Sequence, residues 1–267
     1  MLLLALAVLA GCVWLLSQPW RQERQRARLR AQPFPDAWRR ILRRRVPAIA
    51  RLPTDLQRQL KRHIQVFIAE KPFVGCQGLT LTDEHRVTVA AQACLLLLGQ
   101  TRPDYYPRLH RVLVYPDTFV VKQEHALGAG LVQVQRQAMS GQSWSQGQVI
   151  LSWADVAAGA ADPTDGHNVV LHEFAHQIDQ DKGVADGRPW RASQRARRRW
   201  AAVMDAAYAR LRQQPSAVID AYGATEPAEF FAVVTELFFE RPQALAAEAP
   251  EVYAELAALY RLQPLAW

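Results

Sequence analysis

The sequence predicts an α+β fold, and three features of its 267 residues lead to that prediction. Apolar residues recur three and four positions apart from residue 37 to about residue 99, which indicates helices. Short β-branched or alternating runs follow between residues 111 and 153, which indicates a small sheet. After Asp165 the helical spacing returns. Half of the residues are hydrophobic, so the chain can bury a sizeable core in one large domain or two small ones.

The first twenty residues carry no charged side chain and predict a transmembrane helix over residues 1–20. Trp20 stands where an aromatic anchor would meet the membrane interface. A cleaved signal peptide fits less well, because no basic residue precedes the apolar run. Residues 9–12 resemble the lipobox that ends in the acylated cysteine of a lipoprotein, although residues 13–16 stay apolar after Cys12. A lipoprotein and a buried soluble helix therefore remain the alternatives.

A strongly basic segment follows this apolar run. Residues 21–62 hold 14 Lys and Arg against three acidic residues, whereas the whole chain has a net charge of only +7. We interpret residues 21–32 as a solvated basic linker beside anionic lipid headgroups and expect no direct nucleic-acid binding, because the rest of the chain is net acidic. The positive-inside rule then places the following domain, residues 33–267, in the cytoplasm at the bacterial inner membrane. Three cysteines, an odd and sparse set, agree with a reducing compartment.

The elements of the domain can be placed in order. Pro33 and Pro35 mark its beginning, and Cys76 and Cys94 in its first half have no partner at ligand spacing. The strands are expected at residues 111–115, 118–122, 130–136 and 148–153. The last of these is expected to offer an edge for an extended peptide. The later helices are expected at about residues 168–180, 190–213, 226–240 and 250–262.

The first of these later helices contains a motif of candidate metal-binding residues. His172, Glu173 and His176 form an H-E-x-x-H sequence. Residues four apart lie on one helical face, so both imidazoles can reach a single Zn²⁺ while Glu173 approaches the water beside it. Asp179, one turn further on, either orients a ligand imidazole or is a surface charge.

A working zinc site needs a third protein ligand. The longer metzincin pattern does not supply it, because Asp179 and Lys182 occupy its glycine and histidine positions. A carboxylate on the helix at residues 226–240 is the natural donor, and this segment contains Glu226, Glu229, Glu236 and Glu240. Glu229 and Glu236 share a face within an apolar run, and spacing alone leaves the choice between them open.

The motif and its surroundings resemble a known family. Residues 152–153, 172–179 and 219–233, together with 114–121 and 140–144, are similar to the Mlc titration factor A (MtfA) family of bacterial zinc peptidases. The resemblance spans about residues 35 to 265 and does not cover residues 1–30. It implies a zincin-like core similar to that of anthrax lethal factor.

The resemblance also implies roles for individual residues. One Zn²⁺ per chain would be bound by His172, His176 and Glu229, with Glu173 as the general base. Tyr222 matches the family tyrosine whose phenol faces the metal, although a packing aromatic near a turn is the plainer interpretation. The expected function is hydrolysis of a peptide or protein substrate, with aminopeptidase activity suggested by the family. The alternative is a regulatory protein that sequesters a transcriptional repressor, and the presence of Glu173 between the histidines favours catalysis.

Overall fold

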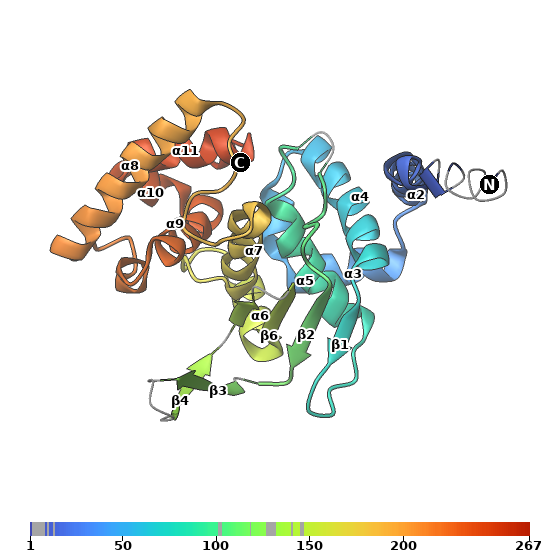
Figure 1. Ribbon diagram of the computed structural model, residues 1–267, viewed down its shortest axis with the longest axis horizontal. Coiled ribbons are helices and arrows are strands. Elements are labelled where there is room, and N and C mark those ends of the chain that lie inside the picture. The colour runs from blue at the N-terminus through green and yellow to red at the C-terminus, as the bar shows by residue number, and fades with distance from the viewer. Residues whose placement is uncertain are drawn as a thin grey trace.

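The computed structural model contains a four-stranded sheet packed against helices and a two-stranded hairpin (Figure 1). The structure describes residues 1, 9, 11–12, 14–100, 103–117, 119–126, 132–139, 141–144 and 147–267. The strands are β1 (Phe73–Gly75), β2 (Arg111–Tyr115), β3 (Phe119–Ala126), β4 (Val132–Met139), β5 (Gly141–Trp144) and β6 (Gln148–Ser152).

The helices account for most of the described chain. They are α2 (Gln18–Ala31), α3 (Asp36–Arg45), α4 (Thr54–Glu70), α5 (Asp83–Leu95), α6 (Trp153–Ala161), α7 (Val169–Asp179), α8 (Gln194–Gln213), α9 (Pro227–Glu240), α10 (Pro242–Glu248) and α11 (Pro250–Tyr260). Short 3-10 helices are η1 (Pro47–Arg51), η2 (Gln180–Lys182), η3 (Ala221–Ala224) and η4 (Pro264–Ala266). The predicted α+β order of helices, strands and helices is confirmed.

The sheet has the order β1-β2-β6-β5. Strands β1, β2 and β6 are parallel, and β5 pairs antiparallel with β6, from Gly141 opposite Leu151 to Trp144 opposite Gln148. The prediction that residues 148–153 form a sheet edge was therefore wrong, because β6 has a partner on both sides. The strands at the two edges are β1 and β5, and β5 is the neighbour of β6. Strands β3 and β4 pair only with each other in the described ladders and project from the body in Figure 1.

Helix α7 lies between the sheet and the C-terminal helices (Figure 1). Its apolar side packs into the core, where the fully buried Phe174 has its ring centroid 5.7 Å from Phe67 of α4 and 4.8 Å from Tyr106. On the other side α7 contacts α9. Burying an aromatic face in this way fixes the rotation of a helix about its axis, so the packing of Phe174 determines where the polar side of α7 points.

The N-terminal basic segment is more closely attached to the domain than a solvated linker would be. Residues 21–32 belong mostly to α2, and Arg26 on this helix is only 7% exposed. Its guanidinium donates to Glu70 of α4 at 2.7 and 2.9 Å and to Asp104 at 3.3 Å. Residues 2–8, 10 and 13 of the predicted membrane-spanning segment, residues 1–20, lie outside the described residues. Within the part of the chain that is described, no helix combines the length and apolar character needed to cross a bilayer.

Candidate metal centre

The H-E-x-x-H motif sits on α7, as the sequence predicts. The helix begins after Asn168, whose side-chain oxygen accepts a hydrogen bond from the Leu171 backbone N–H at 3.0 Å and caps the first turn. Its buried apolar residues include Val170, Leu171, Phe174 and Ala175. Because these residues face the core, His172 and His176 project together from the opposite side, one turn apart.

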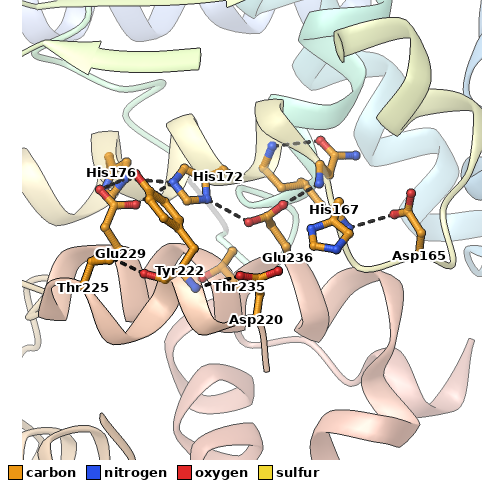
Figure 2. A network of polar contacts seen from close by, with 12 residues as sticks. Asp165, His167, His172, His176, Asp220, Tyr222, Thr225, Glu229, Thr235 and Glu236 are labelled. Atoms are coloured by element: carbon orange, nitrogen blue, oxygen red, sulfur yellow. Dashed lines mark hydrogen bonds and ion pairs between the residues drawn. The ribbon is translucent and has the colours of Figure 1, made fainter. Parts of the chain in front are cut away.

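The opposing wall of the site is α9. Pro227 occupies its first turn, where a missing backbone N–H costs nothing, and the helix then continues through a mostly apolar, buried sequence. Glu229 and Glu236 are two turns apart on this helix, and both reach toward α7 (Figure 2). Their carboxylates contact the same imidazole, that of His172, from its two ends.

The ends of three side chains converge on one point. His172 Nε2 lies 3.2 Å from His176 Nε2 and 2.9 Å from Glu229 Oε2, and His176 Nε2 lies 3.4 Å from Glu229 Oε1. For ligands about 2.0 to 2.1 Å from a tetrahedral Zn²⁺, the expected separation is about 3.3 Å. These side chains form a group able to hold a metal ion, and the three separations fit that geometry. The predicted grouping of His172, His176 and Glu229 is thus present in the structure.

Glu236 takes a different position. His172 Nδ1 lies 2.8 Å from Glu236 Oε1, on the side of the ring away from Glu229 (Figure 2). If the proton is on Nδ1, Nε2 keeps its lone pair for a metal, which is the usual role of a carboxylate behind a ligand histidine. Glu229 lies on the side where the two Nε2 atoms meet, whereas Glu236 contacts the opposite nitrogen of the His172 ring, so the geometry favours Glu229 as the candidate third ligand. The spacing of residues along the sequence does not predict this contact between Glu236 and His172.

The charges around the imidazoles favour a bound cation. Burial alone would lower the pKa of His172, but its hydrogen bonds to Glu229 and Glu236 raise that pKa well above its ordinary value. Burial alone would raise the pKa of Glu229, but hydrogen bonds with His172 and His176 hold it well below its usual range. Two carboxylates therefore already attract positive charge to this position, and a metal ion would satisfy the same attraction.

Glu173 is the buried carboxylate beside this group. It is 4% exposed, and its Oε2 has no hydrogen-bond partner among the described residues. Burial raises its pKa to about 7, and the neighbouring His172 and His176 oppose that shift. A carboxyl group with a pKa near neutrality can both accept and return a proton, as a general acid and base must. A buried oxygen without a partner in the protein is also free to accept a hydrogen bond from water or from a substrate.

Tyr222 borders the same site from η3. Its backbone N–H donates to Asp220 Oδ1 at 2.7 Å, and Thr225 Oγ1 donates to its carbonyl oxygen at 2.7 Å, which fixes the turn (Figure 2). The ring is half-exposed, with its centroid 6.0 Å from that of His172. Partial burial and the Glu229 carboxylate raise the pKa of the phenol to about 12, so the hydroxyl keeps its proton. Its hydroxyl is therefore available as a hydrogen-bond donor beside Glu229 and His172.

The other sequence candidates lie elsewhere. Asp179 is fully buried, and its Oδ2 accepts from the Gly187 N–H at 2.6 Å, so the surface-charge alternative was wrong. Its Oδ1 has no hydrogen-bond partner in the described part of the chain, which gives no support for an orienting bond to His176. Glu226 is the exposed residue before α9, and Glu240 is buried at the far end of that helix. Neither belongs to the convergent group.

A motif helix packed beside a sheet, with two histidines facing a glutamate on a second helix, is the architecture of an H-E-x-x-H metallopeptidase. Sequence comparison agrees, since the family described as "Glucose-regulated metallo-peptidase M90" matches residues 18–261. The chain therefore belongs to this metallopeptidase family, and its resemblance to the Mlc titration factor A proteins is confirmed.

The relatives cover nearly all of the chain. "Uncharacterized protein slr2042" of Synechocystis is 40% identical over 251 residues, 92% of this chain and 90% of that protein. "Mlc titration factor A" of Klebsiella pneumoniae is 36% identical over 228 residues, 83% and 84% of the two chains. The protein of the same name from Cronobacter sakazakii is 33% identical over 258 residues, 94% and 93%. The family match begins at Gln18, the first residue of α2, so the expectation that the resemblance does not reach residues 1–30 was wrong for residues 18–30.

Proposed function

We propose that the protein is a zinc-dependent peptidase. The observation that carries this proposal is the convergence of His172, His176 and Glu229 beside the buried, unpartnered carboxylate of Glu173. Two imidazoles and one carboxylate are the ligand set of many catalytic zinc sites, which keep a further position open. The nitrogen-rich set suits zinc better than magnesium or calcium, which prefer oxygen ligands.

Each of the surrounding residues would have a separate role in peptide hydrolysis. Zinc, when bound, supplies the Lewis acidity that lets water attack a peptide carbonyl near neutral pH. Glu173 would accept a proton from the attacking water and then deliver it to the departing amine, so that no net proton is gained or lost. The Tyr222 hydroxyl would donate a hydrogen bond to the oxygen that becomes negatively charged during the attack. Glu236 would keep the His172 ring in its working orientation.

The substrate is expected to be an extended peptide. The edge strand β5 contacts α7, so its outer side offers backbone groups to a peptide close to the motif helix. A peptide added there would extend the four-stranded sheet by one strand. Aminopeptidase activity rests on the family resemblance, and the test is a comparison of peptides with free and with acetylated amino ends.

The first expected result concerns the metal. The purified full-length protein should carry about one zinc per chain, because one complete set of three ligands is present. Metal analysis after dialysis checks the stoichiometry, and a peptide-cleavage assay checks the activity. Treatment with a chelator should abolish hydrolysis, and zinc should restore it. A protein that hydrolyses peptides equally well after complete removal of the metal would contradict the proposal.

Binding of a transcriptional repressor is the second candidate function. It is favoured by the name of several relatives, which describes them as titration factors for Mlc. For this chain the two functions can be separated, because repressor binding does not require Glu173 to act as a base. A variant that lacks peptidase activity but still retains a repressor in a pull-down would show that binding is independent of catalysis.

We further propose that residues 1–20 anchor the protein to the cytoplasmic face of the inner membrane. The support is the uncharged N-terminal run followed by Arg21, Arg24 and Arg28, which the positive-inside rule would keep in the cytoplasm. A reporter that is active only in the cytoplasm, fused after Trp267, should therefore be active. The mature protein should also retain its first eleven residues. A lipid-modified Cys12 at a new amino terminus would instead place the catalytic domain across the membrane.

A further inference from the structure

Asn168 makes an unusual set of hydrogen bonds for a helix cap. It is 4% exposed, and its Oδ1 caps α7 through the Leu171 N–H. Its backbone N–H donates to Glu236 Oε2, while its side-chain Nδ2 donates to Glu240 Oε1 at 2.9 Å and to Gln92 Oε1 at 2.7 Å. Asn168 thus connects the start of the motif helix to two acidic side chains of α9.

These bonds form a continuous path to the metal centre. Glu240 contacts the Asn168 side chain, the Asn168 backbone contacts one oxygen of Glu236, and the other oxygen of Glu236 contacts His172 Nδ1 at 2.8 Å. The opposite nitrogen of the same ring is the one that faces Glu229. Figure 2 shows Glu236 between the His172 ring and the start of α7. The orientation of His172 is therefore connected through two residues, Glu236 and Asn168, to the buried carboxylate of Glu240 outside the centre.

The chemistry of these contacts explains why asparagine suits this position. Serine, threonine and aspartate can also cap a helix with a side-chain oxygen. Asparagine adds an N–H donor, and Oε1 of the buried Glu240, which is 8% exposed, accepts a hydrogen bond from it at 2.9 Å. A buried carboxylate without a donor is costly and would shift until it found one. The amide of Asn168 thus gives Glu240 Oε1 a donor, while its backbone N–H donates to Glu236 Oε2.

We propose that Asn168 is a positioning residue of the metal centre, fixed by Glu240 and acting on His172 through Glu236. The proposal rests on the proposed zinc peptidase function, since it concerns how that site is held. Asn168 touches neither substrate nor metal ligand directly through its side chain in the described contacts. Its role is to fix the carboxylate that determines the tautomer and rotation of a ligand imidazole.

The test uses Asn168→Ser in the full-length protein. Serine keeps a capping oxygen and the backbone N–H, but it removes the amide that reaches Glu240. Zinc affinity, measured by competition with a chromogenic chelator, should fall by about 10-fold or more, as for other residues behind a metal ligand. The kcat should fall while KM changes little, because the peptide-binding surface is untouched. Thermal unfolding of each variant separates these effects from a loss of folded protein.

Two further variants keep the test decisive if Asn168→Ser folds poorly. Glu240→Leu removes the acceptor without altering the cap, Glu236 or His172, and it should also weaken zinc binding. Glu240→Gln keeps an Oε1 acceptor for the Asn168 amide and removes only the charge, so it should bind zinc almost as tightly as the wild type. The matched control is Ser193→Ala, which removes the equivalent side-chain cap of α8, a hydrogen bond of 3.1 Å from the Ala196 N–H. This control should leave zinc affinity unchanged.

Each outcome has a clear meaning. Wild-type zinc affinity in a folded Asn168→Ser or Glu240→Leu variant would overturn the positioning role of Asn168. Equal losses in Ser193→Ala and Asn168→Ser would overturn it as well, because a general loss of helix stability would then suffice. A wild-type protein that binds no zinc would overturn the proposed function itself, and that result is distinguishable because it appears before any variant is made.

Discussion

Glu173→Gln is expected to retain zinc and to lose peptide hydrolysis by about 10²-fold or more. The amide has almost the shape of the carboxyl group, and Glu173 is outside the group of three candidate metal ligands. An amide cannot accept the proton of the attacking water, so the loss should appear in kcat. The buried position of Glu173 and the pKa of about 7 that burial produces are the properties this prediction depends on.

Metal analysis and steady-state kinetics on the same preparation check this expectation. Glu255→Gln is a suitable control, because Glu255 is also a buried carboxylate, 3% exposed, and is paired with Arg199 at 2.6 Å on α8. That change should reduce thermal stability and leave turnover per folded molecule near the wild-type value. Turnover by Glu173→Gln at the wild-type rate would remove Glu173 from the mechanism.

The sequence predicted the helices of the site well because local signals determine them. The apolar spacing of α7 and α9 and the proline at the start of α9 are all visible in the chain. The sheet was harder to predict, because strand pairing joins segments that are distant in the sequence. In addition, one strand begins where the sequence resembles a turn. Gly141 begins strand β5, although a Ser-Gly pair ordinarily indicates a turn. The identity of the edge strand depends on which segment pairs with β6, and periodicity does not contain that information.

The site shows the same division between local and distant information. Four-residue spacing was enough to bring His172 and His176 together, since one helix turn fixes their separation. The roles of Glu229 and Glu236 depend instead on how α9 crosses α7, which only the packed structure shows. The buried Arg26 is a similar case, because its position in a basic run does not predict that it will pair with Glu70 and Asp104. Asn168 and Glu240 likewise meet only after both helices are packed.

The final prediction separates the two carboxylates that contact His172. Glu229→Ala should lose most of the bound zinc, because it removes one of three ligands from the point of convergence. Glu236→Ala should bind zinc about 10- to 100-fold more weakly, as expected when the partner behind a ligand histidine is lost. The metal content of both variants after identical dialysis, and their affinities in chelator competition, provide the comparison.

The order of the two effects is what tests the geometry. Removing Glu229 leaves two imidazoles, whose Nε2 atoms 3.2 Å apart can still share a metal only weakly. Removing Glu236 leaves all three ligands in place but frees the His172 ring to rotate and to change its tautomer, because the contact at Nδ1 is lost. If Glu236→Ala lost zinc completely while Glu229→Ala bound it normally, the ligand assignment would be reversed, and Glu236 rather than Glu229 would coordinate the metal.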